Sequence, residues 1–559
     1  MKKNYTGISL WGCFLLFFTV HSFAQTKTVG LFTHLSGSED DGYVLFAPVD
    51  NCDTTYLIDK CGREVHKWAA SYRPGLDVYL LPDGTLLRTG WYPNPVFDPS
   101  DVSSGGIIQR FDWDSHLLWQ YLISSPMETQ DHDIYPLPNG NILAAIWEVI
   151  SDSEAIANGR NPSLLGAGLW SAKVEEIQPV GTDSANIVWT WRLWDHLIQD
   201  YDSTKPNYGV VADHPELFNL NYVNTAADAA TNPDWIHLNQ VTYNPTFNQV
   251  MISGHNVDEI WIIDHSTDSA TAAGHTGGTY NKGGDFLYRW GNPGAYNRGT
   301  TADIKLWEQH DPTWITTGKY TNQIMIFNNG LGRPGGNASS IDIINPPVDP
   351  SGNYTLAAGA AYGPDTLTWT YEAPVPGSFY SMYMGGAQTL TNGDILVCNA
   401  EIGQFFEIDS SKNIVWNYIN PVNDGYPAHQ GTPVGLTTVY RCTFYPFSYS
   451  GFSGDTIPVS VFPIELDPLP DTCSITYLNT PLLSGKITTE IFPNPANTSI
   501  TIQSNSLNSI TLTNIIGQTV ITKHYDNAGY AELNTTSLPG GIYILCINGS
   551  QYQQIIIQH

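Results

Sequence analysis

Charged side chains are scarce in this chain of 559 residues, and basic ones are the scarcest. Lys and Arg together number 23 against 53 Asp and Glu, so the formal net charge is −30 although only 14% of residues are charged. A general nucleic-acid binder needs a basic face that displaces counterions from phosphates, so nucleic acid is excluded as a partner. The low charge, with 12% aromatic residues, 50 Gly and 36 Pro, also argues against a disordered chain or a coiled coil.

Long apolar runs are also nearly absent. The one clear run, residues 10–18, follows Lys2 and Lys3 and precedes Ser-Phe-Ala at 22–24. This order of basic, apolar and small residues predicts a secretory signal peptide over residues 1–24, cleaved after Ala24. A membrane anchor is the weaker alternative, because a span needs roughly 20 apolar residues. We therefore expect an exported protein.

Cysteine is rare as well. Six cysteines remain once the signal peptide is set aside, and an oxidising compartment would allow them to pair. Cys52 and Cys61 bracket a strand-like TTYLID segment and could close a short loop, whereas Cys546 lies in an apolar strand pattern typical of a buried free thiol. No Cys or Cys/His spacing fits a structural zinc site, so none is expected.

Helical periodicity is almost missing, and short alternating strands separated by Asp-Gly, Asn-Gly and Pro predict an all-β chain. The strands recur as a unit. One half resembles TYLIDKCGREVHKW (55–68) or FFEIDSSKNIVWNYINP (405–421), and the other VYLLPDGTLLRTG (78–90) or QTLTNGDILVCNA (388–400). About six such units predict a six-bladed β-propeller over residues 25–450. A long β-sandwich or β-solenoid is the alternative, but the unit is too long for ordinary solenoid coils.

The pattern stops after the propeller. Residues 451–485 form a Pro-containing connector, and residues 486–559 then show short alternating strands at the spacing of a small Ig-like β-sandwich. This last module is nearly neutral, so the acidity of the chain belongs to the propeller.

Three of the fifteen histidines share a position in the repeat. His132, His237 and His310 each lie eight residues before the turn that follows their strand, where other blades have Leu76 and Gly385. Equivalent positions on inner strands converge on the axis of a propeller, so we expect the three imidazoles to face one funnel. Each alone is explained as a hydrogen-bonded structural histidine. Together they suit nucleophilic or acid/base chemistry, or metal ligation.

A turn after the His310 strand supplies two further candidates. Arg333, one of only ten arginines, ends the Asn-Asn-Gly turn, and Asn329 of that turn is a candidate substrate contact. A guanidinium is the natural partner of a tetrahedral oxyanion, although a surface turn residue is the plain alternative. His255 ends the strand after His237 and would either reach the same region or cap a turn.

The segments DWIHLNQVTYNP, ISGHNVDEIWIID, QHDPTWI and IMIFNNGLGR resemble the bacterial aryl-sulfate sulfotransferases. These are secreted six-bladed propellers that move a sulfuryl group from a phenolic sulfate ester to another phenol without a nucleotide donor. The resemblance covers about residues 30–450. It implies that His237, His310 and Arg333 are active-site residues, that a phenolic sulfate and a phenol are the partners, and that no cofactor is needed.

The family also uses a histidine that is transiently sulfurylated, and the blade-five position of this chain has Gly385 instead. His429 is the nearest later candidate, and His132 completes the predicted catalytic set. The implied mechanism is ping-pong nucleophilic catalysis with a loose transition state. Trp235 and Trp314 are candidate walls for an aryl ring, although core packing explains either one alone.

The C-terminal module carries FPNPANTSITI (492–502), NIIGQ (514–518) and LPGGIYIL (538–545). Together these resemble a type A sorting domain of the type IX secretion system, found in Bacteroidetes. The resemblance implies that residues 486–559 engage the type IX machinery. The protein would then cross the outer membrane and be kept at the cell surface or released.

Two other functions stay open. One is a non-catalytic surface propeller that binds a glycan or a protein partner, which the missing blade-five histidine favours. The other is a metal-dependent hydrolase or oxidase built on the three aligned histidines and their neighbouring carboxylates, Asp131, Asp133 and Asp311. We expect no metal there, because Arg333 would repel it. Sulfate esters are anions, so the sulfotransferase hypothesis requires Arg333 and the histidines to create a positive funnel within an acidic shell.

Overall fold

The computed structural model describes residues 26–97, 105–166, 168–224, 232–433, 435–452, 462–469, 473, 490–514, 518–548 and 551–558. The predicted signal peptide lies outside these residues. The chain divides into two compact units, Met1–Thr476 and Tyr477–His559, with the division inside the predicted connector. Among the described residues, no helix is both long and apolar enough to cross a membrane.

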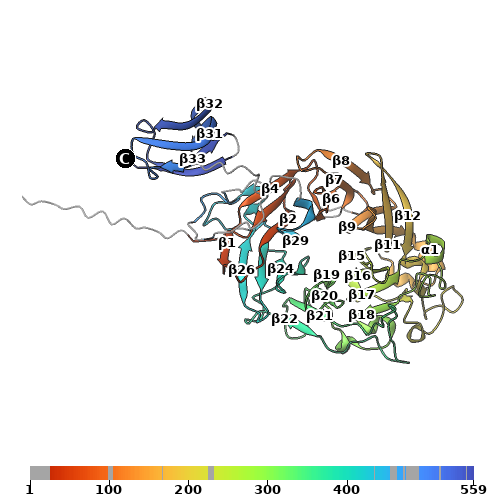
Figure 1. The fold of residues 1–559 in the computed structure, drawn as a ribbon. Helices are drawn as coiled ribbons and strands as arrows, with labels where there is room; N and C mark the ends of the chain where they lie inside the picture. The colour runs from red at the N-terminus through yellow and green to blue at the C-terminus, as the bar shows by residue number, and fades with distance from the viewer. Residues whose placement is uncertain are drawn as a thin grey trace, which may run out of the picture. The chain divides into compact units, whose positions relative to one another are not determined.

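The first unit contains six antiparallel blades, which confirms the predicted propeller (Figure 1). The innermost strands of neighbouring blades contact one another around the axis. From the axis outwards, the strands of the first three blades are β5 (Pro74–Leu80), β6 (Leu86–Trp91), β7 (Gly106–Phe111) and β8 (Leu117–Leu122); β9 (Glu128–Pro136), β10 (Ile142–Ile150), β11 (Leu169–Val180) and β12 (Ser184–Arg192); β15 (Leu238–Asn244), β16 (Gln249–Gly254), β17 (Glu259–Asp264) and β18 (Tyr288–Trp290). Those of the last three are β19 (His310–Trp314), β20 (Ile324–Asn328), β21 (Ser340–Ile344) and β22 (Trp369–Tyr371); β23 (Gly386–Thr389), β24 (Ile395–Asn399), β25 (Gln404–Ile408), β26 (Ile414–Ile419) and β1 (Gly30–His34); β29 (Val439–Pro446), β2 (Gly42–Pro48), β3 (Thr54–Asp59) and β4 (Glu64–Ala69).

The tight turns after the inner strands explain why the Asp-Gly and Asn-Gly pairs recur. Gly84, Gly140 and Gly393 adopt φ values of 84°, 86° and 93° in these turns. A residue with a side chain rarely adopts this left-handed conformation, whereas glycine does so without strain.

Two distant parts of the chain close the ring. β29, near the end of the propeller, pairs with β2, near its start, in one sheet, and β1 adds a fifth strand to the blade before it by pairing with β26. Closure of this kind covers strand edges that would otherwise be exposed.

Connections between strands carry the remaining short elements of the propeller unit. These are α1 (Asp152–Ala157), α3 (Ser269–Ala272), β13 (Leu197–Ile198), β14 (Phe218–Asn219), β27 (Val422–Asn423), β28 (Tyr426–Pro427) and the 3-10 turns η1 (Pro162–Leu164), η2 (Leu193–Asp195), η3 (Val211–Asp213), η4 (His255–Val257), η5 (Pro293–Tyr296), η6 (Thr301–Asp303) and η7 (Ser450–Phe452).

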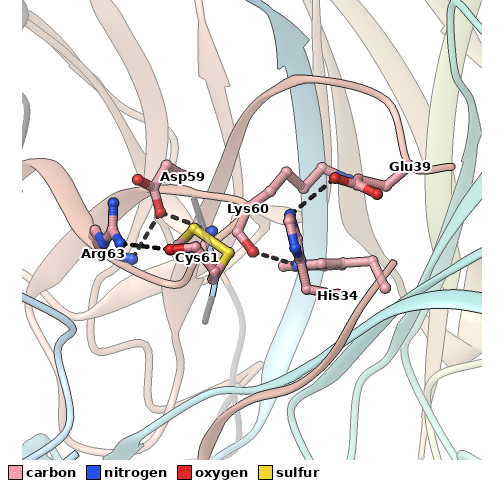
Figure 2. Close-up of a disulfide and its surroundings, with 8 residues drawn as sticks. His34, Glu39, Asp59, Lys60, Cys61 and Arg63 are labelled. Carbon is pink, nitrogen blue, oxygen red and sulfur yellow. Dashed lines mark hydrogen bonds and ion pairs between the residues drawn. A yellow bond between two sulfur atoms is a disulfide. The ribbon is translucent and has the colours of Figure 1, made fainter. Parts of the chain in front are cut away.

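A disulfide joins Cys61, in the turn between β3 and β4, to Cys473 (Figure 2). The prediction that Cys61 pairs with Cys52 is therefore wrong. Cys52 is buried in the apolar core of the last blades, where its thiol lies 3.6 Å from the carbonyl oxygen of Thr54. Cys546 is free, as predicted, although it is only partly buried.

The segment ahead of this disulfide, residues 462–473, lies against the propeller where it is described, and we call it the C-terminal strap. The carbonyl oxygen of Phe462 accepts a hydrogen bond from the amide of Glu64, Ile464 enters the same apolar core, and the amide of Leu466 donates to the carbonyl of Ala428. Part of the predicted connector is therefore fixed to the blades.

The described residues of the second unit form five strands in antiparallel pairs, which match the predicted β-rich sorting module. β31 pairs with β30 at one end and with β33 at the other, so its two halves belong to different parts of the sheet. Ile500, Leu512 and Leu545 are fully buried in its core. The strands are β30 (Glu490–Phe492), β31 (Ser499–Asn514), β32 (Thr519–Asn534), β33 (Gly541–Ile547) and β34 (Gln551–Ile557).

Candidate active site

Four imidazoles lie in a row near the axis of the propeller. The ring centroids are 4.4 Å apart for His132 and His237, 4.9 Å for His237 and His255, and 5.1 Å for His255 and His310. We call these four residues the histidine cluster. Three blades supply it, as the sequence predicted for His132, His237 and His310, and His255 joins them.

Asn329 fixes the tautomer of His310. The side-chain amide of Asn329 donates to the carbonyl oxygens of Ser381 and Met384, so its own oxygen faces Nδ1 of His310 at 2.8 Å. Nδ1 therefore carries the hydrogen, and Nε2 accepts a hydrogen bond from the amide of Met384 at 3.2 Å. Both nitrogens are occupied, and burial lowers the pKa of His310 well below its usual range. Asn329, predicted to contact substrate, instead orients a histidine.

His237 has one engaged nitrogen and one available nitrogen. Its backbone adopts φ 54°, and Oδ2 of Asp234 lies 2.5 Å from Nδ1, while Oδ1 accepts the backbone amide of His237. The carboxylate holds the hydrogen on Nδ1 and leaves the lone pair on Nε2. Among the described residues, Nε2 has no hydrogen-bond partner, and the side chain is 20% exposed.

His132 and His255 are kept neutral by burial. Nδ1 of His132 contacts Asp131, and burial lowers the pKa of His132 to about 4. Nδ1 of His255 lies 2.8 Å from the side-chain oxygen of Asn256, and burial, with the neighbouring His237, lowers the pKa of His255 to about 3. At neutral pH both imidazoles are therefore uncharged.

The shared register does not itself bring His237 to His132. Hydrogen bonds between neighbouring inner strands show which positions match: a carboxylate oxygen of Asp133 accepts the amide of Val241 in the next blade, and one of Asp311 accepts the amide of Ala387 in the next blade. Gly385, which the repeat aligns with His132 and His310, lies two residues before Ala387. The same count back from Val241 gives Asn239, not His237. His237 reaches the cluster from the loop that leads into β15.

Blade five cannot contribute a histidine at the matching position. Gly385 adopts φ 113°, and a Cβ atom there would lie 2.7 Å from the ring of Phe327. The histidine that the family resemblance implies is therefore sterically excluded from this position. His429, the alternative from the sequence, is exposed and bonds to Asp467 at 2.7 Å beside the C-terminal strap. Among the described contacts, none links His429 to the histidine cluster.

A cavity of about 670 Å³ adjoins the cluster. Asp234 and Trp235 line it beside His237, and Glu308, 3.7 Å from Nε2 of His255, lines it further along. Trp235 thus borders the cavity, although its ring also packs under Arg160 at 4.8 Å. Trp314 instead lines a smaller cavity of about 200 Å³ with Tyr79, Tyr135 and Gln388.

Arg333 lies at the edge of the larger cavity. Its neighbours Gly332 and Pro334 line the cavity, and its guanidinium is 5.1 Å from the ring centroid of Trp307, which lines it too. The guanidinium is already bonded to Glu372 at 3.1 Å and to the hydroxyl of Ser340 at 2.7 Å.

The cavity is not the positive funnel that the sequence analysis required for sulfate esters. Its described lining has three carboxylates, from Asp234, Asp258 and Glu308, and one guanidinium, from Arg160. Burial raises the pKa of Asp258 to about 6, so this carboxylate is mostly charged at neutral pH. An anionic substrate here would depend on Arg333 or on a protonated histidine.

Sequence reasoning missed the charged layer next to the histidines. The guanidinium of Arg441 contacts Asp77, Asp133 and Asp311, at 3.1 Å for Asp77 and 2.8 Å for Asp311, and also Gln240 at 2.8 Å. We call Arg441 and the three aspartates the axial ion network. Burial raises the pKa of Asp133 and Asp311, whereas the carboxylates raise that of Arg441. The scarcity of arginine was the only signal in the sequence.

The axial ion network also changes the metal hypothesis. Asp133 and Asp311, which were candidate carboxylates for a metal held by the aligned histidines, turn to Arg441 instead. Of the three candidate carboxylates, only Asp131 contacts a histidine of the cluster, His132, among the described contacts.

Comparison with known proteins gives two family matches. A family model described as Arylsulfotransferase (ASST) matches residues 110–426, and one described as a secretion system C-terminal sorting domain matches residues 490–558. No curated protein matches the chain.

Solved structures give a more distant likeness. A protein of unknown function from Bacteroides caccae is 10% identical, over 72% of this chain and 98% of that one, with a TM-score of 0.38. A periplasmic gluconolactonase from Pseudomonas aeruginosa is 11% identical, over 72% and 99%, with a TM-score of 0.36. Scores this low carry no argument about function.

Proposed function

Since the chain belongs to the arylsulfotransferase family, we propose that the histidine cluster transfers a sulfuryl group between phenols, with His237 as the nucleophile. The sorting domain indicates export to the cell surface or the medium. The observation that carries the proposal is the pair of Asp234 and His237, which leaves Nε2 of His237 with a lone pair and no partner among the described residues. An imidazole oriented by a carboxylate in this way is a prepared nucleophile.

In the first half-reaction, Nε2 of His237 attacks the sulfur of an aryl sulfate, the bond from sulfur to the aryl oxygen breaks, and phenolate leaves. The product is a sulfurylated imidazolium whose Nδ1 keeps its hydrogen and donates it to the carboxylate of Asp234, which stabilises the new positive charge. A second phenol, as its phenolate, then attacks the sulfur, the bond from sulfur to nitrogen breaks, and Nε2 of His237 recovers its lone pair. The proton of the second phenol passes through water to the phenolate released in the first half-reaction. His132 and His255 are neutral neighbours, so they do not repel the imidazolium.

Charge on the sulfuryl oxygens needs a cation, and Arg333 is the candidate. The carboxylates along the cavity oppose an anion, so an ester there needs the positive charge of Arg333. Because this guanidinium is already paired with Glu372, the pair must loosen when the ester binds. Glu372 is well exposed, so the pair is screened by solvent and inexpensive to rearrange.

A second function, a non-catalytic surface propeller that binds a glycan or protein, is favoured by two observations. The blade-five histidine is excluded by Phe327, and carboxylates dominate the lining of the cavity. A binding module of this kind would hold a neutral or cationic ligand rather than a sulfate ester.

The decisive experiment measures transfer from 4-nitrophenyl sulfate to added phenol. We expect phenol-dependent release of nitrophenol by the parent protein, a loss of at least about a thousandfold in His237→Ala, and a smaller loss in His310→Ala, because His310 has no available nitrogen. His116→Ala is the matched control, since His116 is also bonded to an aspartate but is exposed.

Mass spectrometry after incubation with donor alone separates the two functions. A sulfuryl group on the peptide that contains His237 supports transfer. Absence of both turnover and modification in the parent protein supports the binding module, and unchanged turnover in His237→Ala contradicts the role of this residue.

A further inference from the structure

A second group of side chains, outside the histidine cluster, has the form of a metal site. His196 follows η2 at the end of the second blade, and His275 and Asp285 lie in the loop between β17 and β18 of the third blade. The nearest donor atoms of these three residues lie within 4.8 Å of one another. We propose that His196, His275 and Asp285 bind a divalent transition metal ion such as Zn²⁺ and that this ion ties the two blades together.

The tautomer of His196 is the first argument. Nε2 of His196 lies 2.8 Å from the carbonyl oxygen of Ala272, which can only accept, so this nitrogen carries a hydrogen. Nδ1 of a neutral His196 then presents a lone pair to the carboxylate of Asp285, 2.8 Å away. Two lone pairs that face each other repel, and a cation between them removes the repulsion. A histidine that binds metal through one nitrogen commonly donates the other to a backbone carbonyl, as here.

The second argument is convergence. Nδ1 of His275 lies 2.7 Å from the same oxygen of Asp285 that faces His196. Two imidazole nitrogens and one carboxylate oxygen are a donor set suited to zinc and related ions, with a further position left for water. Ligands of a tetrahedral zinc ion are about 3.3 Å apart, so each imidazole nitrogen needs to move only about half an ångström from the Asp285 oxygen. His275 is 58% exposed, which gives an ion a path to the site.

The third argument is that the surrounding residues hold the ligands in place. The ring of Trp191 stacks parallel to His196 at 5.8 Å, and its Nε1 donates to the carbonyl of Gly284, next to Asp285. A Cβ atom at Gly284 would lie 2.6 Å from Nε2 of His196, so only glycine lets the loop approach this closely. Such packing keeps the donors oriented when no ion is bound.

The test uses the protein without its predicted signal peptide. A chelator removes any bound metal, and the protein is then titrated with Zn²⁺ by calorimetry. We expect one ion per chain, a higher Tm with Zn²⁺, and affinity at least about tenfold weaker in His275→Ala and in Asp285→Asn. His275→Ala should fold normally because its side chain is mostly exposed, and His214→Ala is the matched control, being exposed and bonded to Glu216.

Three outcomes overturn the proposal. They are no binding by the parent protein, equal affinity in His275→Ala and His214→Ala, and loss of the ion in His237→Ala instead, which would place it in the histidine cluster. Sulfuryl transfer is assayed separately, so failure of this proposal leaves the proposed function untouched.

Discussion

Two adjacent layers of side chains along the propeller axis differ in charge: one contains neutral imidazoles, and the other contains a guanidinium bonded to carboxyl groups. In the histidine cluster, burial keeps His132 and His255 neutral. Asp234 engages Nδ1 of His237, and Nε2 of His237 has no partner among the described residues. In the axial ion network, one residue further along the same strands, Arg441 is bonded to Asp133, and the surrounding carboxylates raise the pKa of Arg441. The first layer is suited to exchange a group with a ligand, whereas the second joins the inner strands of four blades, β5, β9, β19 and β29.

The comparison is tested most severely by Arg441→Met, which leaves three buried carboxylates without their cation. We expect the free energy of unfolding to fall by about 3–5 kcal/mol, as for other buried ion pairs that lose one partner. Urea denaturation followed by tryptophan fluorescence measures it.

Arg110→Met is the matched control, because the pair of Arg110 and Asp83 is well exposed and should contribute less than about 1 kcal/mol. If both variants lose the same small amount, the axial ion network does not hold the blades.

Acid should weaken the histidine cluster first. The pKa of His255 is about 3 in the fold and about 6.5 unfolded, so the unfolded chain binds the proton first and stability falls as pH drops from 6.5 towards 3. At pH 5 this amounts to about 2 kcal/mol. We therefore expect His255→Gln to lose about 2 kcal/mol less than the parent between pH 7 and pH 5.

Denaturation at the two pH values measures this difference. His116→Gln, at an exposed histidine, serves as control and should not flatten the acid dependence. An equal acid dependence in His255→Gln and the parent protein would mean that His255 is not held neutral.

The smallest expected effect belongs to Tyr440, which lies between the layers. Its hydroxyl donates to the carbonyl of Asn239 at 2.7 Å, and its ring is 6.3 Å from that of His132 and 6.4 Å from that of His310. Tyr440→Phe should cost about 1 kcal/mol of stability, the contribution of one hydrogen bond. Tyr426→Phe, at an exposed tyrosine, should cost nothing. A large loss of transfer with unchanged stability would move Tyr440 into the catalytic layer.

The blades could be predicted from sequence because their information is local. Asn-Gly and Asp-Gly turns, such as those ending in Gly84 and Gly140, mark each hairpin, and alternating apolar residues mark its strands. The convergence of His132 and His310 follows from the repeat, since inner strands of any propeller meet at the axis, whereas His237 reaches the same place from the loop that leads into β15.

The rest depends on contacts that no repeat encodes. Register shifts interrupt β9, β15 and β19, and they allow neighbouring residues such as His310 and Asp311 to reach the axis together. In a regular strand, successive side chains point to opposite faces, so only one of two neighbouring residues would point towards the axis. The partners of Arg441 and of Cys61 are likewise more than a hundred residues away in the sequence, at positions that local patterns do not distinguish.

The disulfide between Cys61 and Cys473 has a mechanical consequence. The two cysteines are 412 residues apart in the sequence, and the chain between them includes β4, all strands of five blades except β1, and β29, the strand that closes the sixth blade. Tension applied to the chain beyond Thr476 reaches Cys473, crosses to Cys61 and continues towards the N-terminus, so the enclosed residues carry no load while the bond is intact. A propeller pulled by its C-terminal tail would therefore leave β29 without load, and the force would act on β3, β2 and β1 instead.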